Sequence, residues 1–143
     1  MHPYNITCDP SLLDLSAVHA FLTRSTWSPG IPAATVERAV RNSLCVGAYL
    51  AGQQVGFARV VTDSATFAYL ADVYVLEAHR GRGLAKRMVQ GLLQQSPMQG
   101  LRRVLLATRD AQGLYAQLGF KPLAYPDRFM ELHNPDAYKA PPP

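Results

Sequence analysis

An apolar stretch that ends at Leu76 is followed by the segment Arg80-Gly81-Arg82-Gly83-Leu84-Ala85, which places two glycines among basic residues. The apolar stretch predicts a buried strand, and the residues after the glycines predict a helix that begins at once. Glycine lets the backbone turn and approach a ligand with no side chain in the way. The first turn of the helix adds unpaired N–H groups and the positive end of the helix dipole. This junction therefore predicts an anion site, most naturally one for phosphate.

Two common phosphate loops are excluded by the residues at this junction. The P-loop string G-x-x-x-x-G-K-[ST] does not occur in the chain. The dinucleotide fingerprint G-x-G-x-x-G/A, begun at Gly81, would need glycine or alanine where Lys86 stands. The stretch about twenty residues further on, residues 100–103, has no acidic side chain to bind a ribose. The loop must therefore hold its phosphate in another way.

The length and composition indicate one ordinary globular domain. The chain has 143 residues, of which 48% are hydrophobic and 17% charged, and this is enough for a sizeable core. We expect residues 1–138 to form a single domain and residues 139–143, which end in three prolines, to be disordered. The first residues show no signal-peptide pattern, and no segment approaches the roughly 18 apolar residues of a membrane-spanning helix. A cytoplasmic protein without a membrane partner is expected.

The charged and metal-binding residue types narrow the classes of ligand. The net charge is +4, and eleven of the fourteen basic residues are arginine, which suits bidentate contacts to phosphate or carboxylate. No aromatic–basic interleaving of the RRM type and no helix-turn-helix is present, so a nucleic-acid partner is not expected, and a small basic nucleic-acid-binding domain is the weakest hypothesis. Cys8 and Cys45 are predicted to be reduced thiols, and the four histidines show no metal spacing, so no metal is predicted.

Hydrophobic periodicity and turn residues predict a mixed α/β sheet with a βαβ unit. The predicted elements are helices over residues 12–25 and 33–42, strands over 44–50, 54–61 and 66–75, a helix from the glycine loop to Ser96-Pro97, a strand over 103–108, a helix over 111–118 and an edge strand over 129–132. Gly119 stands where the last helix needs a left-handed residue, with Phe120 as its hydrophobic partner.

Two motifs carry a resemblance to a known family. The string Arg80-x-x-Gly83-x-Ala85 resembles the [QR]-x-x-G-x-[GA] acetyl-CoA loop of the GCN5-related N-acetyltransferases, the GNAT family. Some thirty residues later, Tyr115 and Leu118-Gly119-Phe120 match the family's last-helix motif, although Asp110 stands where asparagine is frequent. The loop at residues 77–79 also lacks a proline often found there. With both motifs in order, the chain is identified as a member over nearly its whole length.

The resemblance implies a fold, an activity and a co-substrate. The fold would be that of the acetyl-CoA N-acyltransferases, with a central mixed, mostly antiparallel sheet and helices on both faces. The activity would be transfer of an acetyl group from acetyl-CoA to a primary amine, by direct attack in a ternary complex. The contacts to acetyl-CoA would come from Val73, Tyr74, Val75, Arg80, Gly81, Arg82, Gly83, Leu84, Ala85, Lys86, Asp110 and Tyr115.

Within that set, backbone groups do most of the binding. The backbone of residues 73–75 would pair with the pantetheine arm, and the N–H of Val75 would donate to the thioester carbonyl. The pyrophosphate would lie on the N–H groups of residues 81–85. Arg80, Arg82 and Lys86 either add positive charge there or stay solvated.

Two side chains are candidates for the chemistry. The resemblance makes Tyr115 the general acid that protonates the departing sulfur, and a phenol with a pKa of about 10 is protonated at neutral pH. The alternative is a tyrosine that only fills the groove between helix and sheet. Asp72, the only carboxylate in its strand, is the candidate base. The alternative is a structural carboxylate paired with an arginine such as Arg59, and strict alternation would put Asp72 on the opposite face from Tyr69 unless a bulge intervenes. The amine could also lose its proton to water before it binds.

The acceptor is a small-molecule or peptide amine whose identity stays open, as does the length of the acyl group. The candidates to line its pocket are Trp27, Arg59, Tyr69, Tyr125 and Arg128. Trp27 could equally be part of the core. A monomer and a homodimer are both compatible with the sequence, and a non-catalytic acyl-CoA-binding regulatory module is the main alternative to an enzyme.

Overall fold

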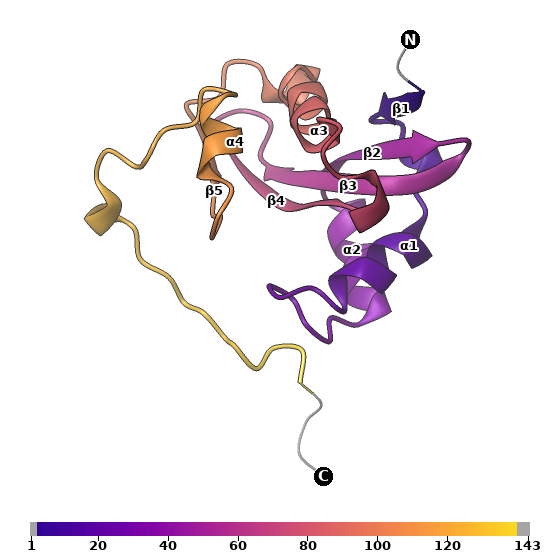
Figure 1. Cartoon of the computed structure of the whole chain (residues 1–143). Helices are drawn as coiled ribbons and strands as arrows, with labels where there is room; N and C mark the ends of the chain where they lie inside the picture. Colours follow the sequence, from indigo (N-terminus) through magenta and orange to yellow (C-terminus); the bar gives the residue numbers. More distant parts are fainter. Residues whose placement is uncertain (1–2, 140–143) are drawn as a thin grey trace.

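The computed structural model describes residues 3–139 and contains a five-stranded sheet with helices on both faces (Figure 1). The strands follow one another across the sheet in the order β1-β2-β3-β4-β5. Neighbouring strands are antiparallel except β4 and β5, which are parallel. The predicted mixed, mostly antiparallel α/β fold is confirmed. Residues 140–143 of the tail that was predicted to be disordered lie outside the described residues.

The elements agree closely with the predicted ranges in the middle of the chain. The strands are β1 (Tyr4–Thr7), β2 (Leu44–Leu50), β3 (Gln53–Thr62), β4 (Phe67–Val75) and β5 (Arg103–Leu106). The α-helices are α1 (Leu15–Leu22), α2 (Ala33–Arg41), α3 (Leu84–Leu93) and α4 (Gln112–Ala116). Short 3-10 turns are η1 (Pro10–Leu12), η2 (Glu77–His79), η3 (Ser96–Met98) and η4 (Pro126–Arg128).

The sheet separates two apolar cores. Helix α3 lies on one face, where Met88 and Leu92 are fully buried, and α1 and α2 lie on the other face with Val18 and Val36 buried (Figure 1). Because side chains alternate along a strand, β2 and β3 contribute residues to both cores. The sheet therefore forms the central layer between the two cores, and the loops that follow β4 and β5 leave it at one end.

Strand β4 contains a bulge at the position that the sequence analysis left open. Phe57 of β3 pairs with Tyr74 of β4, and Arg59 pairs with Ala71, so two steps along β3 correspond to three steps along β4. Asp72 lies in this interval, and its backbone is left-handed, with φ of 56°. As a result Leu70 packs in the α3 core, whereas Tyr74, four residues on, packs in the α1–α2 core. The alternation of β4 is therefore reversed between its two halves.

The N-terminal quarter differs from the prediction in two ways. The single helix predicted over residues 12–25 is divided into η1 and α1, because two aspartates each begin a helical turn. Asp9 Oδ1 accepts from Ser11 N at 2.9 Å, and Asp14 Oδ1 accepts from Ala17 N at 3.0 Å. The sequence analysis also missed strand β1, a four-residue segment that pairs with β2 at the sheet edge.

The prediction of an edge strand over residues 129–132 is wrong for this structure. These residues belong to no strand, and Met130 is 98% exposed. A strand needs a neighbour for its backbone groups, and within residues 3–139 nothing pairs with this segment. The chain after α4 instead runs outside the body as an extended segment (Figure 1).

Candidate active site

A cleft opens where β4 and β5 part. β5 pairs only with the first four residues of β4, from Phe67↔Arg103 to Leu70↔Leu106. Beyond that point the edge of β4 borders a cleft of about 420 Å³. The residues that line this ligand cleft come from α1 and the loop after it, β4, the glycine loop, α3 and α4: Phe21, Trp27, Val73, Tyr74, Val75, His79, Arg80, Gly81, Gly83, Leu84, Ala85, Lys86, Ala111, Leu114 and Tyr115. The two sequence motifs thus meet in one place.

The backbone of Val75 faces this cleft. Leu76 N–H donates to the carbonyl of Val55 at 2.8 Å, so the backbone groups of Leu76 face β3. Successive residues in an antiparallel pair direct their backbone groups to alternate sides, so those of Val75 point away from β3. Arg80 Nε donates to the carbonyl of Val75 at 2.9 Å, which agrees with that direction. The Val75 N–H is therefore left facing the cleft.

The glycine loop has the geometry of an anion site. Gly81 and Gly83 have φ of 78° and 75°, in the left-handed region that other residues rarely adopt. No side chain caps the helix at Gly83, and Arg87 N donates to the carbonyl of Gly83 at 3.1 Å as the first bond of α3. The N–H groups of residues 84–86 precede that bond and have no partner within the helix. They point, with the positive end of the helix dipole, to the mouth of the cleft.

The basic side chains around the loop have distinct roles. Arg80 ties the loop to the end of β4 through the bond to Val75. The Arg82 guanidinium lies 6.0 Å from the centroid of the Tyr4 ring, and Lys86 Nζ donates to Gln117 Oε1 at 3.3 Å. Of these three residues, Arg80 and Lys86 line the cleft and Arg82 does not. Arg80 and Lys86 thus each have a protein partner, whereas the backbone N–H groups of residues 84–86 have none within the helix.

Tyr115 is placed in the cleft by the end of α4. Phe120 N donates to the Tyr115 carbonyl at 3.1 Å and Gly119 N to that of Ala116 at 3.1 Å, which is the Schellman pattern. Gly119 has φ of 95°, and the rings of Tyr115 and Phe120 meet edge to face at 5.9 Å, as the sequence predicted. Burial raises the pKa of the Tyr115 phenol, so the hydroxyl is protonated at neutral pH and can donate a proton. Within residues 3–139 this hydroxyl has no hydrogen-bond partner.

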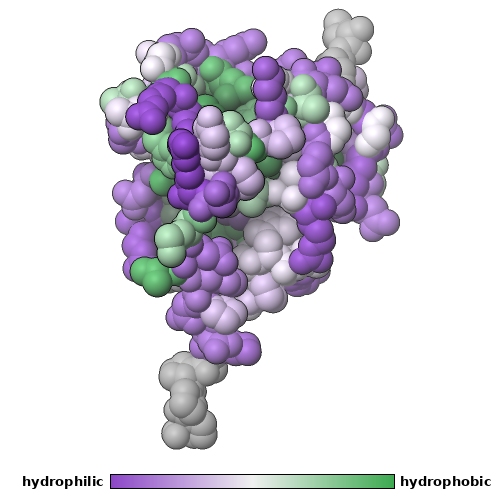
Figure 2. Space-filling model, turned by 90° about the vertical axis from the view of Figure 1, so that its left-hand side faces the viewer, coloured by the Kyte–Doolittle hydropathy of each residue, from purple (hydrophilic) through white to green (hydrophobic). Residues whose placement is uncertain are grey.

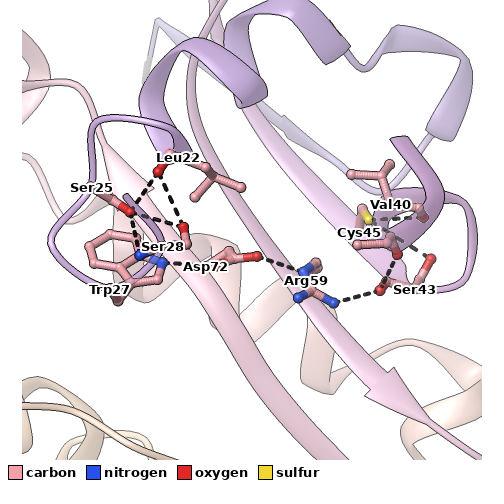
Figure 3. A network of polar contacts seen from close by, with 10 residues as sticks. Leu22, Ser25, Trp27, Ser28, Val40, Ser43, Cys45, Arg59 and Asp72 are labelled. Atoms are coloured by element: carbon pink, nitrogen blue, oxygen red, sulfur yellow. Dashed lines mark hydrogen bonds and ion pairs between the residues drawn. The ribbon is translucent and has the colours of Figure 1, made fainter. Parts of the chain in front are cut away.

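Asp72 lies in a polar network beside the cleft (Figure 3). Its Oδ1 accepts from Trp27 Nε1 at 2.8 Å, and its Oδ2 accepts from Arg59 Nε at 2.7 Å. Arg59 also donates to Ser43 Oγ at 3.0 Å. Both carboxylate oxygens therefore accept hydrogen bonds from protein side chains. The bond to Arg59 is the structural pairing that the sequence analysis gave as the alternative to a catalytic role. Asp72 is not among the residues that line the cleft, and its role as a base stays a prediction.

The other candidate residues are divided between this cleft and other surfaces. Trp27 lines the ligand cleft, half exposed, whereas Arg59 lies behind it in the Asp72 network. Tyr69 pairs with Leu105 and is partly exposed, and Asp110 is exposed next to Ala111, which lines the cleft in its place. Tyr125 and Arg128 lie beyond β5, where the guanidinium stacks 3.7 Å from the Tyr125 ring centroid.

Four residues of the cleft lining were missed by the sequence analysis: Phe21, His79, Ala111 and Leu114. Phe21 of α1 stacks on Tyr74 with ring centroids 3.9 Å apart, so an apolar helix residue becomes part of the cleft wall. His79 lines the cleft, and its Nδ1 lies 2.9 Å from the hydroxyl of Tyr4. Only the position of His79 directly before the glycine loop could have indicated its place.

Comparison with known proteins now assigns the family. Residues 13–120 match the family model described as the Acetyltransferase (GNAT) family. The chain belongs to this family. The match includes both the glycine loop and Tyr115. The sequence prediction of a GNAT member is confirmed.

Relatives extend the assignment to the whole fold. A crystal structure of a GNAT-family protein from Xanthomonas campestris pv. campestris has 46% identity and a TM-score of 0.93, and the match covers 98% of this chain and 99% of that one. A Gibberella zeae protein that is named as an acetyltransferase is 36% identical over 142 residues, and the match covers 82% of this chain and 79% of that protein. A Clostridium acetobutylicum structure described with acetyl-CoA shares the fold at 18% identity and a TM-score of 0.66, covering 91% of this chain and 94% of its own.

Two searches within residues 3–139 bear on other classes of site. No group of three or more histidine, cysteine, aspartate or glutamate side chains is arranged to hold a metal ion. None of the helices there has the length and apolar character that crossing a membrane requires.

Proposed function

We propose that this GNAT-family chain binds acetyl-CoA in the ligand cleft and transfers the acetyl group to a primary amine within a ternary complex. The observation that carries the proposal is the meeting, in one cleft, of the uncapped start of α3, the bare edge of β4 and the hydroxyl of Tyr115. The acetyl-CoA named for the Clostridium acetobutylicum neighbour, which shares the fold, supports the choice of ligand.

The residues of the cleft fit the parts of such a ligand. The N–H groups at the start of α3 would hold the diphosphate, because the glycines bring the backbone close without side chains. A Cβ on Gly81 or Gly83 would meet no atom within 4 Å, so open space borders the loop for the ligand. The edge of β4 at residues 73–75 would pair with the amides of the pantetheine arm as an added strand would.

Acetyl-CoA would supply the acetyl group as a thioester, whose carbonyl carbon a neutral amine attacks while the carbon–sulfur bond breaks. The Val75 N–H faces the cleft and would donate to the carbonyl oxygen as negative charge develops there. Tyr115 would give its phenolic proton to the departing sulfur, and the attacking nitrogen, which becomes positively charged, would release a proton to water as the amide forms; solvent would then reprotonate Tyr115. Its raised pKa supports this assignment, because an acid must hold its proton at working pH.

The proton on the acceptor amine needs a separate route. None of the residues that line the cleft within residues 3–139 is an aspartate or a glutamate. We propose that the amine loses its proton to water before attack. Two side chains are competing acceptors: His79, which lines the cleft with its Nδ1 2.9 Å from the Tyr4 hydroxyl, and Asp72, which would act only if its bonds to Trp27 and Arg59 opened.

The absence of a carboxylate from the described lining of the cleft also favours, as a second candidate, a module that binds acyl-CoA without turnover. Release of the free CoA thiol over a panel of small-molecule and peptide amines distinguishes the two. Thiol release that depends on the amine supports the enzyme. Binding of acetyl-CoA with no thiol release for any amine would favour the binding module.

Binding itself is tested by the melting temperature with acetyl-CoA, and with CoA, NAD and ATP as controls. A ligand at about 100 times its Kd stabilises the folded state by about 2.7 kcal/mol, and this raises the Tm of a domain of this size by several degrees. A rise with acetyl-CoA and CoA alone is expected. No rise with either would overturn the assignment of the glycine loop as a CoA site.

A further inference from the structure

An exposed tryptophan lies at one end of the ligand cleft. Trp27, the only tryptophan of the chain, belongs to the loop between α1 and α2, lines the cleft and is 51% exposed. Its Nε1 donates to Asp72 Oδ1 at 2.8 Å, so the indole lies at the bulge of β4 (Figure 3). The glycine loop follows the opposite end of the open strand edge, after Val75. The cleft therefore has a tryptophan end and a glycine-loop end.

The loop that carries Trp27 is fixed by hydrogen bonds of its own. Ser25 Oγ donates to the carbonyl of Leu22 at 2.7 Å, and Ser28 N donates to Ser25 Oγ at 3.0 Å (Figure 3). Both serines are buried. Because the loop and the indole N–H are both held in place, Trp27 loses little conformational entropy when a ligand packs on it. The exposed indole is therefore a preorganised binding surface.

A second ring stands beside the indole. Phe21 lies 6.0 Å from Trp27 between ring centroids, with the two planes tilted by 44°. Tyr74 is buried and stacks on Phe21 at 3.9 Å, with planes 6° apart, so it supports the Phe21 ring from behind. Phe21 itself is only partly buried. We refer to Phe21 and Trp27 as the aromatic wall, and two rings at such an angle suit a flat apolar group through stacked and edge-to-face contacts.

The charges around the aromatic wall offer no partner to a charged ligand group. Asp72 and Arg59 form an ion pair at 2.7 Å, so each neutralises the other. None of the residues that line the cleft within residues 3–139 is an aspartate or a glutamate. The basic residues of the lining lie in η2, the glycine loop and the first turn of α3, which is the other end of the cleft: His79, Arg80 and Lys86. A second ammonium group on a ligand would therefore have nothing to pair with.

We propose that the aromatic wall is the acceptor subsite and selects a primary amine joined by a short alkyl chain to an aryl group, with no second charge. This inference rests on the proposed acetyl transfer, because it names the acceptor of that reaction. The amine nitrogen bonds to the carbonyl carbon, the carbon–sulfur bond breaks, Tyr115 protonates the sulfur and the nitrogen releases a proton to water. The aryl ring would lie on Phe21 and Trp27, and the alkyl chain would direct the amino group along β4 toward Val75.

A larger hollow on the other side of β5 is the rival place for the acceptor. It measures about 1040 Å³, and Figure 2 views the molecule from this side and shows apolar atoms in a hollow bordered by hydrophilic ones. Four basic residues line it and would repel an ammonium group: Arg102, Arg103, Lys121 and Arg128. Residues 73–75 of the open β4 edge line the ligand cleft and not this hollow. The aromatic wall is therefore the better acceptor subsite.

The fluorescence of Trp27 tests the subsite without turnover. Because the chain has one tryptophan, its emission reports on the aromatic wall alone. The full chain is saturated with CoA, which has no acetyl group to transfer, and is titrated with 2-phenylethylamine. The competing ligands n-butylamine and 1,4-diaminobutane carry the same primary amino group without a ring. We expect a saturable change in emission, with a Kd for 2-phenylethylamine about tenfold lower than for either competitor.

A matched pair of variants tests the ring of Phe21. Phe21→Leu keeps an apolar side chain but removes the flat ring, and it should raise the Kd of 2-phenylethylamine about fivefold. Phe67→Leu is the control, because Phe67 is 38% exposed at the start of β4 and lines neither the cleft nor the hollow. Calorimetric titration with CoA should give one Kd for the wild type and both variants, which shows that they are folded.

Thiol release from acetyl-CoA with the same three amines separates this inference from the proposed function. A higher kcat/KM for 2-phenylethylamine than for the other two supports both. Faster release with n-butylamine or 1,4-diaminobutane would overturn the aromatic selection and leave acetyl transfer standing. Tight binding of 2-phenylethylamine with no thiol release from any amine would support the aromatic subsite and overturn acetyl transfer. Equal Kd values for the three amines, or an unchanged Kd in folded Phe21→Leu, would overturn the subsite.

Discussion

Asp72 and Arg59 are joined by an ion pair of 2.7 Å that crosses the bulge of β4, with their side chains only 11% and 18% exposed. The aspartate makes this contact from a left-handed backbone conformation. Asparagine tolerates that conformation better than most residues, so Asp72→Asn removes the charge while it keeps the bulge.

We expect Asp72→Asn to lower the free energy of unfolding by about 2–4 kcal/mol, because it leaves the Arg59 guanidinium with no carboxylate in a largely buried place. Urea denaturation measures the loss. If the pair is structural, kcat should change by less than about tenfold once the variant is folded. A stable variant whose kcat falls by about 10² or more would instead assign Asp72 as the general base.

Gly83→Asp should weaken acetyl-CoA binding. A carboxylate about 6 Å from a phosphate is repelled by about 3 kcal/mol at an effective dielectric constant near 20, which is roughly a hundredfold in Kd. Gly100→Asp is the matched control, because Gly100 also has a left-handed φ and open space around a Cβ but lies outside the cleft. Calorimetric titration with acetyl-CoA should show a loss for the first variant alone. Equal losses in both would mean that backbone strain, and not the phosphate, is responsible.

Tyr115→Phe should lower kcat by about 10²–10⁴ and leave the Kd of acetyl-CoA nearly unchanged. The phenylalanine keeps the edge-to-face contact with Phe120, so the fold should persist. The wild type should also keep its activity to high pH on this account, because the raised pKa of Tyr115 keeps the acid protonated and activity is lost only as pH rises through that pKa. A pH profile of kcat for both proteins is the measurement, and a variant as active as the wild type would remove Tyr115 from the chemistry.

Cys45 should make the protein sensitive to alkali. Burial raises the pKa of this thiol from its ordinary value of 9.0 to about 12. Because the folded state holds the proton more tightly, the contribution of Cys45 to stability is complete below pH 9 and is lost as pH rises from 9 toward 12. The loss should be on the order of 4 kcal/mol for a shift of this size.

Cys45→Ala should therefore show a smaller fall in the free energy of unfolding between pH 8 and pH 11 than the wild type, although it starts from a lower value. Cys8→Ala is the control, since Cys8 is only partly buried. Guanidinium titrations at each pH measure the effect. Parallel curves for wild type and Cys45→Ala would show that the thiol does not ionise on unfolding.

Local signals explain what could be predicted. Strand β2 and helix α2 were placed within one residue, because apolar periodicity and flanking turn residues are adjacent in the sequence. The glycine loop was predictable for the same reason: strand, left-handed glycines and helix follow each other within a few residues. The Schellman end of α4 also needs only six consecutive residues.

The rest depends on contacts between distant segments. Trp27 and Asp72 are 45 residues apart, and no pattern in either neighbourhood indicates that they bond. The short strand β1 is defined by its pairing with β2, about forty residues later. The segment at residues 129–132 has the pattern of a strand but no strand partner within the described chain, so a prediction from the pattern alone was wrong there. Phe21 was missed for a similar reason, because its place in the cleft comes from stacking on Tyr74, which is distant in the sequence.

The extra residue at Asp72 has a consequence for how β4 tolerates changes in length. Because Tyr74 stands four residues after Leu70 and yet packs on the opposite face, a regular strand that kept Asp72 would turn Tyr74 toward α3 and Val75 toward α1. Deleting Asp72 together with the bulge would leave Tyr74 three residues after Leu70, so both side chains would keep their present faces. The strand could therefore lose this one residue without exchanging its faces, and what it would lose are the contacts of Asp72 with Trp27 and Arg59.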